Sequence, residues 1–362
     1  MVKNLGENMK ILFLNTLHSH YLKNTLYIGL KKILGEDLDI FPYPNIDNDS
    51  FTVKYDEKSF LDWKGIKEKI DSDYYDYIIL ECINQYTAKY VKYVLKNNHK
   101  KKNIIVVDFG DFPYIKKIIS NKKVIAYFKR EKLMSNLKAH IYLKKHLLGI
   151  LHYNCNILSK CLSEPFILNE LYISPSNIFK SKKLRPIPLG VVNLEEYCPW
   201  LKNIKKKEKE YDVSFIATPN TKERTIIFDV LKELEKEYDV KCYTNKGSLK
   251  FEEYLKIISL SKISINTYGY GVDTFRYYEV PYLNTMLLTK KPIIEIPNNF
   301  IDRKSAVFYN NASEVKNLIL HYLENDKWKK IAKEGNTHVN KYFVDEKLAK
   351  YLLNIVEGEL NE

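Results

Sequence analysis

The sequence predicts an α/β protein with two doubly wound domains, each built on a parallel sheet with helices on both faces. A length of 362 residues suggests about two domains. Short apolar runs alternate with amphipathic segments in both halves, as strands alternate with helices in such folds. These runs are apolar at nearly every position, which is typical of parallel strands buried on both faces.

The first half opens with a strand at residues 9–15 (MKILFLN). The helix expected at 22–34 ends at Gly35, because glycine is favoured just after a helix C-terminus. Residues 133–183 are expected to be largely helical or irregular, whereas two prolines exclude a helix at 185–190. The other expected strands are 37–43, 75–81, 103–108 and 124–128, and the other expected helices are 66–70 and 86–96.

The second half repeats the alternation after a highly charged stretch at 198–210, which is predicted to be a linker. Ser313 is expected to cap a helix whose apolar residues line one face. The expected division is therefore a domain at 1–197, the linker, and a domain at 211–345, followed by a C-terminal helix at 346–362. The expected strands are 211–217, 240–244, 263–267, 286–289 and 306–309, and the other expected helices are 227–238, 251–259, 276–282 and 346–360.

Residues 261–292 hold the most informative pattern: a strand, a glycine-rich turn, a helix and a second strand. This is the layout of a phosphate- or nucleotide-binding α/β unit. Gly269 and Gly271 would let the backbone approach a phosphate or sugar closely, or would simply form a turn. Arg276 and Glu279 lie three residues apart and share a helix face, one a cation for phosphates and the other an acceptor for sugar hydroxyls.

Composition limits the class of protein. The net charge of +13 fits an anionic partner, such as nucleic acid, a membrane surface or a phosphorylated substrate, but also fits lysines spread over solvated faces. Five cysteines show no zinc-ligand spacing, so we expect free thiols, no metal and a cytoplasmic protein. No apolar run reaches the ~20 residues of a membrane helix, which leaves peripheral membrane contact open.

Several catalytic motifs are missing, among them the P-loop, GxGxxG after the first strand, GxSxG and the protein-kinase set. Asp71-Ser72-Asp73 matches the letters of a DxD metal motif, but its place between a helix and a strand indicates a turn.

A more specific resemblance lies in YDVSFIA at Tyr211, DTFRYYE at Asp273 and IAKEGNTHVNKYF at Ile331. Together with EEYLKIISLSKISIN at Glu252, these segments resemble the C-terminal domain of GT-B glycosyltransferases. They are most similar to the spore-maturation and spore-coat type. VVDFGDFPYI, YFKRE and PIPLGV resemble the N-terminal domain more loosely. The resemblance implies two facing Rossmann-like domains, with the last helix packing back on the first.

The resemblance also assigns roles in the second domain. It implies that Glu279 accepts hydrogen bonds from the nucleotide ribose, and that Arg224 and Lys222 contact the donor phosphates. Arg276 suits the charge that a diphosphate leaving group gains as the glycosidic bond breaks, or an ion pair with a neighbouring carboxylate. The sequence departs from the retaining family at Gly271, where that family has a glutamate. Either Asp273 partly replaces this carboxylate or the sugar is held differently.

Four candidates lie in the first domain, after expected strands. His18 could act as a base, with a surface histidine as the plain alternative. Asp108 could also be a base or could cap a turn. Lys129 and Arg130 could meet an acidic acceptor or the donor diphosphate.

The resulting hypothesis is a metal-independent glycosyltransferase of the hexosyltransferase type, with a UDP- or GDP-linked sugar as donor and no further cofactor. The first domain would bind the acceptor, which the sequence leaves open between a cell-surface glycan, a protein and modified phage DNA. The alternative hypothesis, suggested by the charge of +13, is a non-catalytic nucleic-acid-binding protein on a decayed GT-B scaffold.

Overall fold

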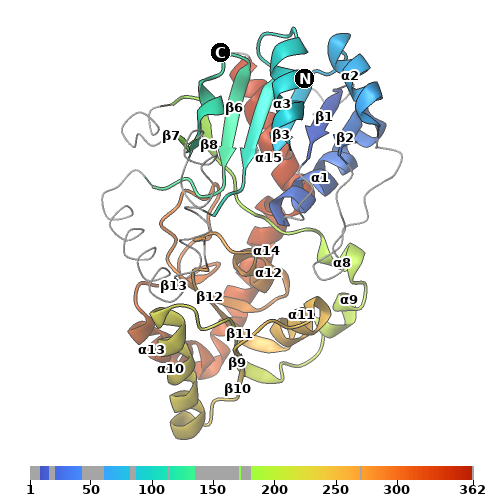
Figure 1. Cartoon of the computed structure of the whole chain (residues 1–362). Coiled ribbons are helices and arrows are strands. Elements are labelled where there is room, and N and C mark those ends of the chain that lie inside the picture. The colour runs from blue at the N-terminus through green and yellow to red at the C-terminus, as the bar shows by residue number, and fades with distance from the viewer. Residues whose placement is uncertain are drawn as a thin grey trace. The chain divides into compact units, whose positions relative to one another are not determined.

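Two parallel β-sheets organise the chain, one in each of two units (Figure 1). In the computed structural model, the first unit comprises Met1–Lys132, Phe166–Val192 and Val344–Glu362. The second comprises Leu133–Pro165 and Asn193–Phe343, so the chain returns to the first unit at its end. The structure describes residues 9–15, 21–42, 61–81, 87–111, 115–134, 171–172, 181–269 and 271–360.

The sheet of the first unit has six parallel strands in the order β2-β1-β3-β4-β6-β8. Strands β1, β3, β4 and β6 are buried along their whole length, as their continuous apolar runs require. Pro186 is tolerated in β8 because this strand lies at the sheet edge. The strands are β1 (Ile11–Leu14), β2 (Leu38–Phe41), β3 (Tyr77–Glu81), β4 (Ile104–Asp108), β6 (Val124–Lys129) and β8 (Leu184–Pro186).

The last helix of the chain packs against the first helix of this unit. Gly29 in α1 lies directly against the backbone of Asp345 and the side chain of Ala349, a closeness that no larger residue would permit. Lys32 Nζ lies 3.1 Å from Asp345 Oδ1. The helices of the unit are α1 (Tyr21–Leu34), α2 (Trp63–Asp71), α3 (Ala88–Asn97) and α15 (Asp345–Leu360), and β5 (Ile115–Lys116) pairs antiparallel with β7 (Leu171–Tyr172).

The sheet of the second unit has five parallel strands in the order β10-β9-β11-β12-β13. Its strands are β9 (Tyr211–Ile216), β10 (Cys242–Asn245), β11 (Ser261–Asn266), β12 (Met286–Lys290) and β13 (Val307–Tyr309). Its helices are α8 (Leu194–Tyr197), α9 (Leu201–Ile204), α10 (Lys222–Tyr238), α11 (Phe251–Ser259), α12 (Arg276–Tyr282), α13 (Val315–Leu323) and α14 (Trp328–Tyr342).

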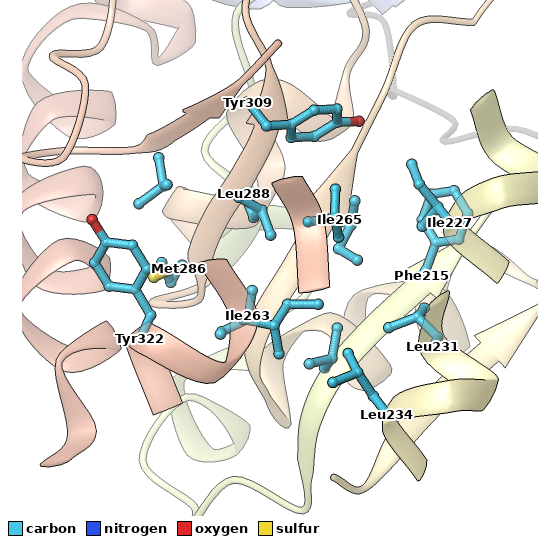
Figure 2. Close-up of a cluster of buried hydrophobic side chains, with 14 of the residues drawn as sticks. Phe215, Ile227, Leu231, Leu234, Ile263, Ile265, Met286, Leu288, Tyr309 and Tyr322 are labelled. Atoms are coloured by element: carbon cyan, nitrogen blue, oxygen red, sulfur yellow. The ribbon is translucent and has the colours of Figure 1, made fainter. Parts of the chain in front are cut away.

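The core of the second unit forms where side chains of β9, β11 and β12 meet helices α10 and α13. Figure 2 shows Phe215 beside Ile227 and Leu231, and Met286 beside Tyr322. Helix α10 begins at an N-cap, Thr221, whose side chain accepts from the amide of Arg224. The core therefore fixes the helix whose first turn carries Arg224.

The predicted strands of both sheets are confirmed, with shifts of a few residues at their ends. The turn predicted at Asp71-Ser72-Asp73 is also confirmed, because α2 ends at Asp71 and Asp73 has a φ of 53°. Helix α14 was not predicted. Most of residues 133–183 and all of 16–20, which include His18, lie outside the described residues.

Candidate functional site

The candidate site of the second unit lies at the carboxyl edge of its sheet, where β9 and β11 run side by side. The strand order reverses at this pair, since β10 lies on one side of β9 and β11 on the other. Ligands of open parallel sheets bind at such a switch point. The two segments that leave it are residues 217–221, which lead into α10, and 267–275, which lead into α12.

Arg224 lies in the first turn of α10, directly after the first of these segments, and its side chain reaches toward the second. Its Nη1 donates to the carbonyl of Thr218 and to Asn220 Oδ1, both at 2.9 Å. A Cβ at Gly269 would lie 3.5 Å from Arg224 Nη2, so the guanidinium is packed against that glycine. The backbone there turns tightly, because the Gly269 amide donates to the Gly271 carbonyl at 3.0 Å. Arg224 thus lies against the glycine turn that Gly269 and Gly271 form.

Arg276 is the first residue of α12, directly after the second segment, and its side chain reaches back toward β9. Its Nη2 donates to the carbonyl of Ile216, the last residue of β9, at 2.5 Å. Its Cζ lies 5.9 Å from the centre of the Tyr254 ring, a cation–π contact. The side chain is buried, so its charge is held at the end of the sheet rather than in bulk water.

Glu279 is completely buried and bound to the same tyrosine. The Tyr254 hydroxyl donates to Glu279 Oε2 at 2.7 Å. Burial raises the pKa of Tyr254 well above its usual value, and the Glu279 carboxylate raises it further against the opposing effect of Arg276. Tyr254 therefore stays protonated and keeps donating to the carboxylate. The shared face predicted for Arg276 and Glu279 is realised around this one ring.

Helix α12, which carries Arg276 and Glu279, is held in place by contacts with α14. Asn336 Nδ2 donates to the carbonyls of Pro281 and Tyr282 at 3.1 and 2.8 Å, which satisfies oxygens at the end of α12. A Cβ at Gly335 would lie 2.6 Å from the Ser305 carbonyl oxygen and 3.1 Å from Pro281 Cβ. The position of α12 thus depends on the absence of a side chain at Gly335.

Asp273 is buried, and its Oδ1 accepts from the Tyr278 hydroxyl at 2.8 Å. The next residue, Thr274, donates to Asn266 Oδ1 at 2.9 Å. The first contact connects the segment between β11 and α12 to α12, and the second connects it to the end of β11. Lys222, by contrast, is exposed at the first position of α10.

An ion pair between a buried lysine and a half-buried glutamate, which the sequence prediction missed, lies beside Arg224. Lys290 Nζ, at the carboxyl end of β12, lies 2.5 Å from Glu223 Oε2. Burial raises the pKa of Glu223, and Lys290 opposes this rise. The position of Lys290 as the last residue of a buried strand was the signal available, because strand ends line the ligand edge of such sheets.

In the first unit, the predicted residues Asp108 and Lys129 meet at the carboxyl ends of β4 and β6. Lys129 Nζ lies 3.1 Å from Asp108 Oδ1, and the Tyr127 hydroxyl donates to Asp108 Oδ2 at 2.5 Å. Burial has the largest single effect and raises the pKa of Asp108, but Lys129, Lys116 and the hydrogen bonds from Tyr127 and Gly110 together lower it below its usual value. Both charged side chains are buried. Asp108 is therefore ionised and strongly held.

Arg130, the next residue, is buried and forms ion pairs with Asp111 and with Glu131. A further buried pair of opposite charge, which was not predicted, is Lys23 of α1 and Glu81 of β3. Burial lowers the pKa of Lys23, and the Glu81 carboxylate opposes this effect. Several ionisable groups thus gather at the carboxyl edge of the first sheet.

The described residues contain neither a membrane-spanning helix nor a cluster of metal ligands. No helix among them is long and apolar enough to cross a membrane. Within the same described ranges, no three or more His, Cys, Asp or Glu side chains cluster in a way that could hold a metal ion.

Comparison with known proteins identifies a family domain in the second half of the chain. Residues 214–354 match the family model described as Glycosyl transferase-like. This segment runs from β9 into α15 and includes Arg224, Arg276 and Glu279. The second unit and the start of the last helix therefore contain a glycosyl transferase-like domain, which is less than half of the 362 residues. A search among curated proteins gave no match.

Solved structures extend the similarity to the whole chain. A glycosyltransferase from Rickettsia africae has a TM-score of 0.53 and 12% identity, over 98% of this chain and 100% of that chain. A sucrose-phosphate synthase from Thermosynechococcus elongatus has a TM-score of 0.49 and 10% identity over 98% and 100%. HepE of Anabaena, in complex with UDP-glucose, has a TM-score of 0.44 and 9% identity over 97% and 100%. The Rickettsia structure confirms the predicted GT-B fold class.

Proposed function

We propose that this chain is a glycosyltransferase that transfers a sugar from a nucleotide-sugar donor to an acceptor. The observation that carries the proposal is the pair of buried guanidinium groups, Arg224 and Arg276, at the switch point of the second sheet. They lie inside the segment that matches the glycosyl transferase-like family. A site with two fixed cations at the carboxyl edge suits an anionic ligand.

The proposed chemistry follows from the charge that develops on the donor. When the glycosidic bond breaks, the leaving nucleoside diphosphate gains negative charge. Arg276, held by the Ile216 carbonyl and the Tyr254 ring, would stabilise that charge without having to reorganise. Arg224 would contact the same diphosphate from the opposite side of the switch point. Gly269 and Gly271 would let the phosphates approach the backbone.

Glu279 would bind the ribose of the donor. Its carboxylate is oriented by Tyr254, which stays protonated, so the direction of its acceptor lone pairs is set before the ligand arrives. Asp273 already accepts a hydrogen bond from Tyr278. Its role would therefore be to hold the loop between β11 and α12 in position. Lys222 would add a solvent-exposed positive charge near the phosphates.

The first unit would bind the acceptor. A carboxylate whose pKa is lowered is a weak proton acceptor, so Asp108 is poorly suited to general base catalysis. Its role would instead be to hold the Lys129 ammonium in place. Lys129 and Arg130 would supply positive charge at the carboxyl edge of this unit. The role of a base would fall to His18, which lies outside the described residues.

The acceptor we propose is a cell-surface glycan, a protein or modified DNA, and the net charge of +13 favours one that carries negative charge. The proposal also includes membership of the spore-coat type of glycosyltransferase. It further includes a cytoplasmic location and peripheral contact with an anionic membrane. We also propose that the reaction needs no metal ion, because arginine side chains would neutralise the charge of the donor diphosphate. Turnover should therefore survive EDTA, and a reaction that stops with EDTA and restarts with Mg²⁺ would refute this part.

A thermal-shift panel tests the proposed function directly. UDP, GDP, their sugar conjugates and inorganic pyrophosphate are added to the full chain, with adenosine as a neutral control. A ligand that binds only the folded protein at 100 times its Kd adds about 2.7 kcal/mol of stability. We expect one nucleoside diphosphate and its sugar conjugate to raise the melting temperature. No shift with any nucleotide would contradict the proposal.

A further inference from the structure

Phe275 is an apolar side chain that the fold leaves open at the candidate site. It is 44% exposed, although it directly precedes α12 and neighbours the buried Arg276. Within the described ranges, only three other large apolar side chains are exposed: Ile226, Tyr238 and Ile301. An exposed aromatic ring next to a buried cation at a ligand edge needs an explanation, because burying apolar area stabilises a fold by about 25 cal/mol per Å².

The ring belongs to a row of three aromatic side chains. Tyr254 lies in the middle, with its ring centre 6.3 Å from that of Phe251 in a stacked arrangement. Its other neighbour is Phe275, also at 6.3 Å, in an edge-on arrangement with an interplanar angle of 80°. Tyr254 therefore contacts one part of the Phe275 ring, while much of that side chain remains open to solvent.

The same tyrosine connects this ring to the proposed binding groups. Its hydroxyl donates to Glu279 at 2.7 Å, and its ring lies 5.9 Å from the Arg276 guanidinium. An open aromatic surface, a carboxylate and a guanidinium thus surround one buried side chain. A nucleoside diphosphate has three matching parts, namely a flat aromatic base, a ribose with two hydroxyls and an anionic diphosphate.

We propose that Phe275 is the surface on which the base of the donor nucleotide stacks. This inference rests on the proposed function and adds a specificity residue to it. Stacking a base on an aromatic side chain contributes about 1–3 kcal/mol, and it depends on a flat π-surface that every base offers. Phe275 would therefore make the site select nucleotides over simple diphosphates, while contributing little to the choice between bases.

The test measures the binding of UDP, GDP, UDP-glucose and inorganic pyrophosphate by calorimetry. The variants are Phe275→Ala, Phe275→Leu and Phe275→Tyr, with Ile301→Ala as the control because Ile301 is 52% exposed in the same unit. The leucine variant keeps an apolar contact with Tyr254 but has no π-surface. We expect both the alanine and leucine variants to lose about 5- to 150-fold in affinity for the bound nucleoside diphosphate. Phe275→Tyr and Ile301→Ala should bind it as the wild type does, and pyrophosphate affinity should be the same in all five proteins.

Three results would overturn the inference alone, with the wild type still binding nucleotide. One is a nucleotide affinity within twofold of wild type in the alanine or leucine variant. Another is an equal loss of pyrophosphate affinity, which would mean a general disturbance of the site. The third is a loss confined to UDP-glucose, which would place the sugar, not the base, on the ring. If the wild type binds pyrophosphate but neither UDP nor GDP, the proposed function fails and this inference fails with it.

Discussion

Arg276, on the helix that follows β11, donates a hydrogen bond to the carbonyl of Ile216 at the end of β9. Arg224, on the helix that follows β9, packs against Gly269 in the segment that follows β11. Each arginine thus reaches across the switch point from one strand to the neighbour. This reciprocal arrangement holds two positive charges close to the same two strand ends.

Replacing Arg276 should mainly affect catalysis. Arg276→Ala removes a preorganised donor to the leaving group, so we expect kcat to fall by about 10²-fold or more. Arg276→Lys keeps the charge but loses the planar fork, and should recover only part of this loss. Initial rates at saturating donor measure both variants. Arg303→Lys is the control, because the Arg303 side chain is 72% exposed in the same unit. Wild-type turnover by Arg276→Ala would exclude the proposed role.

Removing the Tyr254 hydroxyl should weaken both the fold and the donor site. Tyr254→Phe leaves the buried Glu279 with one donor fewer, which costs about 1–3 kcal/mol in unfolding free energy. If Glu279 binds ribose, nucleotide affinity should fall as well, while pyrophosphate affinity should not. Denaturant titration and calorimetry measure the two effects. Tyr238→Phe, at a residue that is 46% exposed, should change neither quantity. A stable Tyr254→Phe protein with normal affinity would show that this contact orients nothing.

The position of α12 should be sensitive to a single methyl group on α14. Gly335→Ala would place its Cβ 2.6 Å from the Ser305 carbonyl, so something must shift, at a typical cost of about 1–3 kcal/mol. Gly358→Ala is the matched change in α15, where a Cβ would meet nothing within 4 Å. It should stabilise by up to about 1 kcal/mol through helix propensity. Urea unfolding of both variants compares them, and equal free energies would contradict the packing described.

The sequence predicted the strands better than the contacts between charged side chains. Strands such as Ile104–Asp108 and Met286–Lys290 consist of continuous apolar runs, and this pattern alone indicates a buried parallel sheet. Helix α14 was not predicted. Its buried residues do have helical spacing: Trp328, Ile331, Ala332 and Val339. The apolar face that they form is narrow, however, and Gly335 interrupts it. A close helix contact, which needs that glycine, cannot be read from periodicity.

The candidate site was predicted only in part for a related reason. Arg276 and Glu279 could be paired from their spacing, since residues three apart share a helix face. Their common partner, Tyr254, lies on another helix, and no local pattern connects it to them. The pair Glu223–Lys290 also joins residues far apart in the sequence. Such contacts depend on strand order, which fixes the neighbours of each strand end and is not a local property.

The pair of Asp108 and Lys129 should make the first unit sensitive to acid. The folded state lowers the pKa of Asp108 below its usual 3.8, so its contribution is present above pH 3.8 and is lost as the pH falls through the folded pKa. Asp108→Asn leaves the buried Lys129 ammonium without this carboxylate and should cost about 3–5 kcal/mol at pH 7. The difference from wild type should shrink below pH 3.8. Denaturant titrations at pH 7 and pH 3 measure it, with Asp229→Asn, at an exposed residue of α10, as control.

Lys209 should give the second unit a stability that rises in mild alkali. Its ammonium donates to the carbonyls of Ser259 and Asn284 at 2.8 and 2.9 Å, and to Thr285 Oγ1 at 3.3 Å. Burial, with a smaller effect of Lys205, lowers the pKa of Lys209 from 10.5 to about 7. Between these two values the unfolded chain binds the extra proton, so the unfolding free energy should increase with pH over that interval.

Lys209→Met removes the titrating group and keeps an apolar stem, so the variant should lack this rise. The measurement is the difference in unfolding free energy between wild type and Lys209→Met at pH 7, 8 and 9. We expect the difference to grow with pH in favour of the wild type, because only the wild type gains from losing the proton. Lys329→Met on the surface should show no such trend, since that side chain is 63% exposed. A difference that stays constant would mean that the three oxygen acceptors and the ends of helices α11 and α12 keep the ammonium charged throughout.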